Sequence, residues 1–247
     1  MPLRWRLIED GAAPGAFNMG VDEALLASAI AGSATLRFYC WEGHWLSLGY
    51  AQRLDPRRIA ACGEAGVGIV RRITGGRAVL HGSDLTYCIA APETALPAGL
   101  RGSYQLVGDA LIAGLQSLGV AAERSVEPSS GAGDFDCFAV PAEDEICVGG
   151  RKLTGSAQRR TRGGVLQHGS IRVASDPPEL ARAVGFAPGV ATSLGELGIR
   201  VGREELLEAL KAAFREALGS RMEPSVLSAA ERRRAERRVE MHPTAVR

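Results

Sequence analysis

The chain has 247 residues, enough for one α/β domain or slightly more. A hydrophobic fraction of 46% and a charged fraction of 23% are those of an ordinary globular protein and exclude a disordered or fibrous chain. The 29 basic and 28 acidic residues leave a net charge of +1, so there is no global electrostatic case for a nucleic-acid partner.

The apolar patterns predict strands and helices in the following order. We expect strands over 3–9, 35–41, 45–48, 67–70 and 84–91, helices over 18–30, 55–66 and 103–118, a loop over 127–141, strands over 143–148, 151–159 and 164–173, and helices over 204–218 and 225–238. The first strand is expected at a sheet edge, the second and third as a pair, and no strand between the last two helices. In the first helix, Asp22 and Glu23 are assigned to the first turn, where the helix dipole favours negative charge.

Strands outnumber helices before about residue 175, and short turns join several strand pairs. We therefore predict an α/β (α+β) fold with a mixed, largely antiparallel sheet flanked by helices. One domain is expected over residues 1–200, with residues 201–247 as a helical C-terminal extension packed on the same domain.

Targeting and redox signals are weak. No apolar segment is long enough to span a membrane, and residues 1–10 lack the layout of a signal peptide, so we expect a cytoplasmic protein with no membrane partner. Five irregularly spaced cysteines favour free thiols over a disulfide framework. The four histidines form no paired metal-ligand spacing, and we predict no metal site.

Lysine is almost absent from the chain. Of 29 basic residues two are Lys, Lys152 and Lys211, which leaves 27 Arg. A background that turns Lys into Arg retains lysine where the broad guanidinium cannot replace a compact ammonium, although chance is the alternative. Lys211 has the surroundings of a solvated helix residue. Lys152 follows Gly149-Gly150-Arg151 and precedes Leu153-Thr154-Gly155-Ser156, which makes it a candidate functional residue.

Residues 71–81, Arg-Arg-Ile-Thr-Gly-Gly-Arg-Ala-Val-Leu-His, place a Gly-Gly pair between two predicted strands. Glycine lets a ligand approach the main chain, which favours the wall of a site for an anionic or acyl substrate. A hairpin turn with exposed charges is the alternative. The glycine spacing fits neither a Walker loop nor a dinucleotide fingerprint.

Cys137 is the candidate nucleophile among the five cysteines. It ends a loop, in Gly133-Asp134-Phe135-Asp136-Cys137-Phe138, where a thiol is accessible and a nearby cation would stabilise its thiolate. The others, Cys40, Cys62, Cys88 and Cys147, lie in strand or helix patterns and are expected to be structural. His168 either supports a site or satisfies a sheet edge. The arginine-rich run 231–238 favours a solvated helix face over a patch for an acidic partner.

Three segments together resemble the lipoate-protein ligase and octanoyltransferase family (biotin/lipoate A/B protein ligases). They are residues 71–81, Gly150-Arg151-Lys152-Leu153-Thr154-Gly155-Ser156-Ala157-Gln158, and Leu166-Gln167-His168-Gly169-Ser170. The resemblance extends to 18–24 and 191–194 and covers about residues 3–220. It implies a fold shared with biotin ligases and class II synthetases, in which the sheet holds an acyl chain in a narrow tunnel.

Within this family the chain is most similar to the cysteine-dependent octanoyltransferases of Gram-positive type. Thr74-Gly75-Gly76-Arg77 is similar to their loop, and Cys137 stands fifteen residues before Lys152, as the nucleophile does in that branch. The chain departs from the family at Gly82, where many relatives have Asp, and at Cys88, where they tend to have Ser.

The resemblance implies site residues and a reaction. Cys137 and Lys152 are the implied catalytic residues, as nucleophile and as cation. The implied substrate-binding residues are Arg72, Thr74, Gly75, Gly76, Arg77, Ala78, His81, Gly155, Ser156, Ala157, His168 and Gly169. An octanoyl or lipoyl group would pass from acyl carrier protein, through a cysteine thioester, to a lysine of a lipoyl domain such as the glycine cleavage H protein or a 2-oxoacid dehydrogenase subunit. A thioester is already activated, so neither ATP nor metal is required.

Three alternatives remain open. An ATP-dependent lipoate-protein ligase would use Lys152 to contact an acyl-adenylate, but ligases usually carry a further C-terminal domain with its own sheet, which the predicted helices do not supply. An amidotransferase would move octanoyl groups between lipoyl domains through the same cysteine. A non-catalytic binder of acyl-carrier or lipoyl domains requires Cys137 and Lys152 to be accidental together.

Overall fold

The computed structural model describes residues 3–125, 136–138, 144–186 and 191–241. The strands are β1 (Trp5–Ala13), β2 (Ala34–Trp41), β3 (Trp45–Leu48), β4 (Gly68–Arg71), β5 (Val79–His81), β6 (Asp84–Pro92), β7 (Glu123–Arg124), β8 (Ile146–Val148), β9 (Arg151–Thr161), β10 (Gly164–Arg172) and β11 (Met222–Ser225). The helices are α1 (Gly15–Ile30), α2 (Pro56–Glu64), α3 (Gly99–Ser117), α4 (Pro178–Ala183), α5 (Arg203–Ala217) and α6 (Ala229–Met241), with a short 3-10 turn at Glu93–Ala95.

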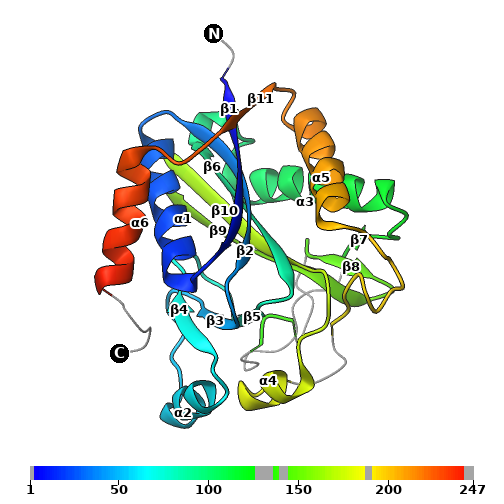
Figure 1. Ribbon diagram of the computed structural model, residues 1–247. Helices are drawn as coiled ribbons and strands as arrows, with labels where there is room; N and C mark the ends of the chain where they lie inside the picture. Colours follow the sequence, from blue (N-terminus) through cyan, green and yellow to red (C-terminus); the bar gives the residue numbers. More distant parts are fainter. Residues whose placement is uncertain (1–2, 126–135, 139–143, 187–190, 242–247) are drawn as a thin grey trace.

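The strands form two sheets (Figure 1). The large sheet has eight strands in the order β11-β1-β2-β6-β10-β9-β8-β7, and the small sheet has three in the order β4-β3-β5. In the large sheet β1 is parallel to both of its neighbours, β11 and β2. Every other neighbouring pair, along the order β2-β6-β10-β9-β8-β7, is antiparallel. The predicted mixed, largely antiparallel sheet flanked by helices is confirmed.

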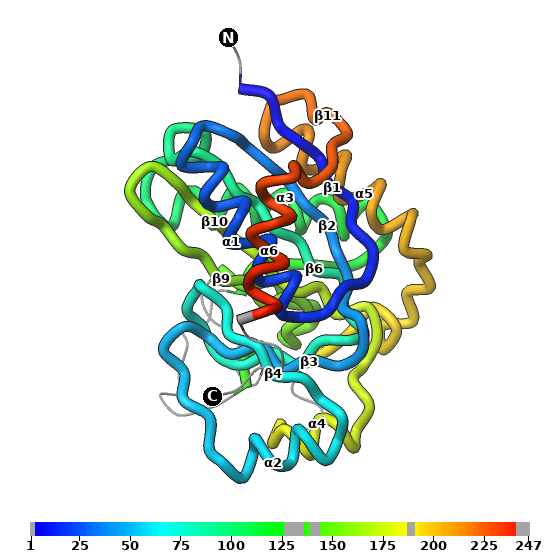
Figure 2. Tube along the Cα trace, turned by 60° about the vertical axis from the view of Figure 1, so that its left-hand side comes forward, coloured from blue at the N-terminus to red at the C-terminus, as the bar shows by residue number. Residues whose placement is uncertain are grey.

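Each face of the large sheet is covered by a pair of helices (Figures 1 and 2). On one face, Leu25 of α1 packs in one core with Ile8 and Leu166 of the sheet, and α6 packs on α1. On the other face, Leu111 of α3 and Phe214 of α5 pack against strand residues such as Phe38. Since both faces are covered, the central strands β2, β6 and β10 are buried along almost their whole length, including polar residues such as Arg37 and His168.

A third core joins the small sheet to α2 and α4 at one end of the molecule (Figure 1). Leu46 and Leu80 of the small sheet are buried there with Cys62 of α2 and with Phe186. The predicted short helix over 55–66 is confirmed as α2. Asp55 caps its N-terminus by accepting a hydrogen bond from the Arg57 backbone N–H at 2.8 Å.

Three predictions about strands are wrong. The first strand is not at a sheet edge, because β11 pairs with it, and β11 is a strand between the last two helices where none was expected. Its sequence, Met-Glu-Pro-Ser, has little strand propensity, and Pro224 is tolerated because the strand is at the edge. β2 and β3 do not pair but belong to different sheets.

Two charged residues also differ from expectation. α1 begins at Gly15, so Asp22 lies beyond its first turn, and the carboxyl is buried rather than exposed to the helix end. Lys211 is not solvated: it is buried, and its ammonium lies 2.8 Å from a carboxyl oxygen of Glu9 and also pairs with Glu208. Among the described helices, none is long and apolar enough to cross a membrane.

Candidate active site

A cavity lies between the two sheets, and about 30 Å³ of it is accessible to the centre of a water-sized sphere. It is lined by residues of the predicted site, namely Arg72, Gly76, His81, Cys137, Gly155, Ser156, Ala157, His168 and Gly169. Seven further residues that were not named as site residues also line it: Met19, Val79 and Ser170, which belong to the resembling segments, and Tyr39, Trp41, Ser47 and Thr86, which do not. A mostly apolar lining with a few convergent polar groups is typical of a small-molecule site.

The cavity has a buried end and an open end. Met19, Tyr39 and Trp41 line the inner part and are at most 5% exposed. Gly76 and Ala157, which also line it, are exposed and half-buried respectively. The mouth of the cavity therefore lies between β9 and the Gly-Gly loop, which we define as residues 72–78.

The backbone of Cys137 is held on both sides. Its N–H donates to the Ala78 carbonyl at 2.8 Å, and its own carbonyl accepts from Lys152 Nζ at 2.7 Å. Asp136 Oδ1 accepts a hydrogen bond from the Phe138 N–H at 2.8 Å, which closes a tight turn around the cysteine. The half-buried thiol is thus fixed beside the cavity.

Lys152 places a cation beside this thiol. Its Nζ lies 3.4 Å from Cys137 Sγ and 2.5 Å from Glu145 Oε1, and the side chain is 1% exposed. Burial alone would lower the pKa of Lys152, but the negative charges of Cys137 and Glu145 outweigh it and raise the pKa above its ordinary value. Lys152 is therefore a fixed ammonium ion next to the sulfur.

Glu145, the carboxylate partner of Lys152, was not predicted from the sequence. The Gly149-Gly150 turn pairs Cys147 with Lys152 across the β8–β9 hairpin. Glu145 lies just before β8, and the register of the hairpin shifts between Ile146 and Cys147, so regular strand alternation does not place it beside the lysine. Its contact with Lys152 is seen only in the folded structure.

His168 anchors the Gly-Gly loop to the large sheet. Its Nδ1 lies 2.7 Å from Asp22 Oδ2, and its Nε2 lies 2.7 Å from Thr74 Oγ1. Burial lowers the pKa of His168 despite the neighbouring Asp22 carboxylate, so the ring is neutral. Nδ1 then carries the proton donated to Asp22, and Nε2 accepts from the Thr74 hydroxyl.

A second chain of buried hydrogen bonds runs through His81. Its Nδ1 lies 2.8 Å from Asp84 Oδ2, and its Nε2 lies 2.7 Å from Ser47 Oγ. Burial would raise the pKa of Asp84, but hydrogen bonds and the charge of His81 lower it overall. Arg72 extends this chain, because its Nη1 donates to Ser47 Oγ at 2.6 Å.

Arg72 also holds the Gly-Gly loop from within. Its Nη2 donates to the carbonyls of Gly75 and Arg77, at 3.2 and 2.7 Å. Burial lowers the pKa of Arg72 from its ordinary value, while the charge of Cys137 opposes that shift. The guanidinium stays charged, so it is a second cation that interacts with the charge of Cys137.

Not all predicted residues line the cavity. Gly75 and Arg77 lie outside the lining, and Thr74 and Ala78 act on it through their hydrogen bonds to His168 and Cys137. The departure at Gly82 has a steric reason: its φ is +147°, and a Cβ there would lie 2.4 Å from His44 Nδ1. Within the described ranges, no group of three or more His, Cys, Asp or Glu side chains is placed to hold a metal ion.

The fold defines the class of protein. Protein Ta0514 of T. acidophilum, solved with bound lipoic acid, superposes with a TM-score of 0.78 at 20% identity over 98% of this chain and 96% of that one. A lipoate-protein ligase A bound with ATP gives 0.78 at 22% identity over 96% and 94%. The chain therefore has the fold of the lipoate ligases.

The sequence defines the family more closely. The model of the lipoyl protein ligase A/B catalytic domain matches residues 14–215, and the chain belongs to that family. Among its relatives is the octanoyltransferase LipM of Kyrpidia tusciae, 40% identical over 94% of this chain and 93% of that protein. The octanoyltransferase LipM of Bacillus subtilis is 34% identical over 91% and 90%.

Proposed function

We propose that the protein is an octanoyltransferase that modifies lipoyl domains through an acyl-enzyme on Cys137. The observation that carries the proposal is the 3.4 Å contact between Lys152 Nζ and Cys137 Sγ at the side of the cavity. Relatives that match more than nine-tenths of this chain are named octanoyltransferase LipM, which supports the same reaction.

The first step forms a thioester on the enzyme. The Cys137 thiolate attacks the carbonyl carbon of an octanoyl thioester carried by acyl carrier protein. The new bond to Sγ forms, the bond to the carrier's sulfur breaks, and that sulfur leaves as a thiolate and takes a proton from solvent. Lys152 stabilises the attacking thiolate and the developing oxyanion.

The second step releases the acyl group to its acceptor. A neutral lysine amine of the lipoyl domain attacks the same carbonyl carbon, an amide bond forms, and the bond to Cys137 Sγ breaks. The amine gives its proton to solvent and the Cys137 thiolate is restored. Because both donors are thioesters, the transfer requires neither ATP nor a metal ion.

Glu145 is a positioning residue in this scheme. Its contact with Nζ keeps Lys152 protonated and oriented toward Cys137. A lysine held in this way acts as a fixed cation rather than as a general base, because its proton is not available to leave.

The test is the intact mass of the protein after mixing with octanoyl-acyl carrier protein in the absence of ATP, followed by peptide mapping. We expect one octanoyl adduct on the peptide that holds Cys137 and none in Cys137→Ala. Cys40→Ala is the matched control, because Cys40 is also a half-buried thiol but lies outside the cavity lining.

Two results would overturn the proposal. The first is an adduct on a cysteine other than Cys137. The second is no adduct, together with an octanoylated lipoyl domain when ATP and free octanoate are supplied, because that result would identify an ATP-dependent ligase.

A further inference from the structure

An exposed tyrosine stands beside the mouth of the cavity. Tyr50, on the connection between β3 and α2, is 63% exposed and is the single aromatic residue among the exposed large hydrophobic side chains of the described ranges. Its N–H donates to the Thr74 carbonyl at 2.8 Å, and a Cβ on the preceding Gly49 would lie 1.9 Å from the Gly76 carbonyl oxygen. Tyr50 is therefore attached directly to the Gly-Gly loop.

Two arginines flank this tyrosine. The guanidinium carbon of Arg159 lies 5.5 Å from the centre of the Tyr50 ring, within the range of a cation–π contact. Arg71 Nη1 donates to the carbonyls of Gly49 and Tyr50, at 2.8 and 3.2 Å. Tyr50, Arg71 and Arg159 form what we call the mouth patch.

The patch carries uncompensated positive charge. Arg159 donates to the Ile73 carbonyl and Arg71 to loop carbonyls. Among the residues that the structure describes, neither guanidinium has a carboxylate partner, whereas many other arginines of this chain do. Carboxylates from another molecule would complete this cluster, and tyrosine with arginine is the composition typical of interface hot spots.

The position of the patch selects which partner it fits. Gly155, Ala157 and Arg159 lie on the same face of β9, and Gly155 lies beside Cys137. A strand rises about 3.3 Å per residue, so the Arg159 Cα lies roughly 13 Å from the Gly155 Cα. A partner whose lysine reaches Sγ must bring its own backbone close to the mouth. An interface of about 800 Å² per partner extends roughly 16 Å from its centre, and so covers the patch.

We infer that the mouth patch docks the acceptor lipoyl domain through carboxylates next to its target lysine. This inference rests on the proposed function. A carrier protein, by contrast, holds its acyl group on a long flexible arm, and its own surface need not lie at the mouth during acylation.

The experiment separates the two half-reactions. Octanoyl-enzyme is prepared from octanoyl-acyl carrier protein, isolated and mixed with increasing lipoyl domain, and single-turnover transfer is followed by mass. We expect Tyr50→Ala and Arg159→Glu to raise the half-saturating lipoyl-domain concentration about 30-fold, which is the loss of one interface hot spot. The salt dependence of this concentration should weaken in Arg159→Glu.

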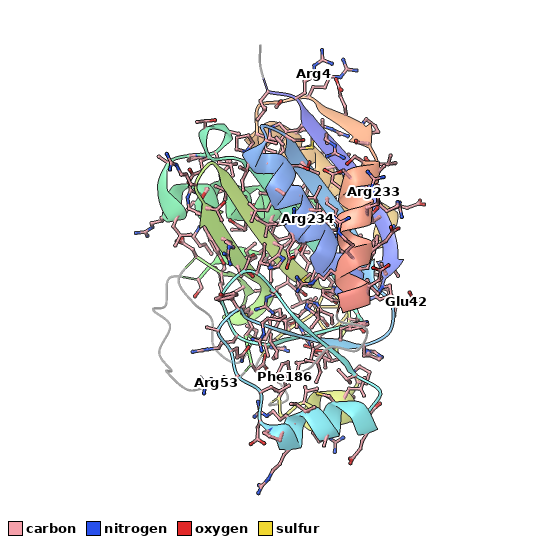
Figure 3. All side chains as sticks on the ribbon, turned by 90° about the vertical axis from the view of Figure 1, so that its left-hand side faces the viewer. Arg4, Glu42, Arg53, Phe186, Arg233 and Arg234 are labelled. Atoms are coloured by element: carbon pink, nitrogen blue, oxygen red, sulfur yellow. The ribbon has the colours of Figure 1, made fainter. Side chains whose placement is uncertain are left out.

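Three controls are built in. Cleavage of the octanoyl-enzyme by hydroxylamine, a small nucleophile, reports on the cavity without docking and should proceed at the wild-type rate. Arg233→Glu changes an exposed arginine on α6, which Figure 3 shows well away from Arg53 on the connection that also carries Tyr50, and should saturate like the wild type. Tyr50→Ala removes only an exposed ring, so its result does not depend on the hydrogen bond that Arg159 makes to Ile73.

The inference is overturned if both patch variants saturate at the wild-type concentration of lipoyl domain. A defect confined to acylation by the carrier protein would also overturn it, because the patch would then dock the donor. If the wild type forms no octanoyl-enzyme at all, the proposed function itself fails and this inference with it.

Discussion

Asp22 and His168 are 146 residues apart in the chain, yet Asp22 Oδ2 and His168 Nδ1 lie 2.7 Å apart in the core beneath the cavity. The Asp22 carboxylate also accepts from the Tyr39 hydroxyl at 3.1 Å and from Arg37 Nη1 at 3.2 Å, so its position is fixed from several sides. Through the neutral ring of His168 this rigidity reaches Thr74, the residue directly before the glycine pair of the Gly-Gly loop. The wall of the cavity is therefore positioned by the large sheet and α1.

Thr74→Val tests this chain of hydrogen bonds. The substitution keeps the shape but removes the hydroxyl, which leaves the buried Nε2 of His168 without a donor at a cost of about 1–3 kcal/mol. We expect the rate of Cys137 acylation at low octanoyl-acyl carrier protein to fall roughly 10- to 100-fold, measured by quenched-flow mass spectrometry. Thr74→Ser keeps the donor and should restore most of the rate. Equal rates in the Val and Ser variants would contradict a role for the hydroxyl.

Lys152→Arg tests whether a compact ammonium is needed. The lysine is 1% exposed and is enclosed by Cys137 and Glu145, so the larger planar guanidinium cannot occupy the same place. We expect acylation of Cys137 to fall at least about 100-fold although the positive charge is kept. The double variant Lys152→Met with Glu145→Gln removes the ion pair without leaving a lone buried charge, and it should be equally inactive with a near-native thermal midpoint. Substantial acylation by Lys152→Arg would show that a compact ammonium is not needed, and substantial acylation by the double variant would remove Lys152 from the mechanism.

Much of the fold follows from local patterns. The long β9–β10 hairpin matches its predicted ranges to within two residues at each end, because alternating side chains and a glycine turn are both local signals. β11 gave no such signal, since it becomes a strand only by adding to the edge of β1 after the chain has passed through α5. The pairing partners of β2 and β3 likewise depend on tertiary packing rather than on their own sequences.

The candidate site shows the same division. Cys137, Lys152 and the Gly-Gly loop belong to contiguous motifs, and the structure brings them together at one cavity. Asp22 was assigned to a helix end because nothing nearby in the sequence shows that it faces His168 on a distant strand. Buried polar groups find their partners only in the folded core, so the residues that support a site are harder to predict than those in its motifs.

Asp136→Asn has an expected dependence on pH. Burial raises the pKa of Asp136 from an ordinary 3.8 to about 6, although the hydrogen bond from Phe138 N–H acts to lower it. The folded state therefore binds this proton more tightly than the unfolded state. Stability from this group is therefore full below pH 3.8 and is lost as the pH rises through 6. Asn keeps the acceptor but cannot ionise, and we expect the variant to be more stable at pH 8 by up to roughly 3 kcal/mol, with no difference at pH 3.5.

Thermal unfolding of both proteins across that pH range is the measurement. Asp136→Ala is the comparison that lacks the acceptor for Phe138 N–H, and it should be less stable than Asp136→Asn at every pH. A gap between wild type and Asp136→Asn that stays constant from pH 3.5 to pH 8 would contradict the raised pKa.

Glu231→Gln tests how the C-terminal helix is fastened. Glu231, at the start of α6, accepts from Arg6 Nη1 at 2.7 Å, from Ser28 Oγ at 2.8 Å and from the Ser228 N–H at 2.7 Å. Although burial acts to raise it, these hydrogen bonds and the Arg6 charge lower the pKa of Glu231 from 4.5 to about 2. The carboxylate therefore adds stability that is fully present above pH 4.5 and is lost as the pH falls toward 2.

We expect Glu231→Gln to lower the free energy of unfolding at pH 7 by roughly 2–3 kcal/mol, and the difference from wild type to shrink as the pH is lowered to 3. Urea unfolding at each pH measures it. Glu236→Gln, an exposed carboxylate on the same helix, should change stability by less than about 0.5 kcal/mol. Because α6 packs on α1, which supplies Met19 to the cavity lining and Asp22 to His168 beneath it, loosening this anchor should also slow acylation of Cys137. A Glu231 variant as stable as the Glu236 variant at pH 7 would show that Glu231 does not fasten the helix, which would leave its apolar contacts and Arg238 to hold it.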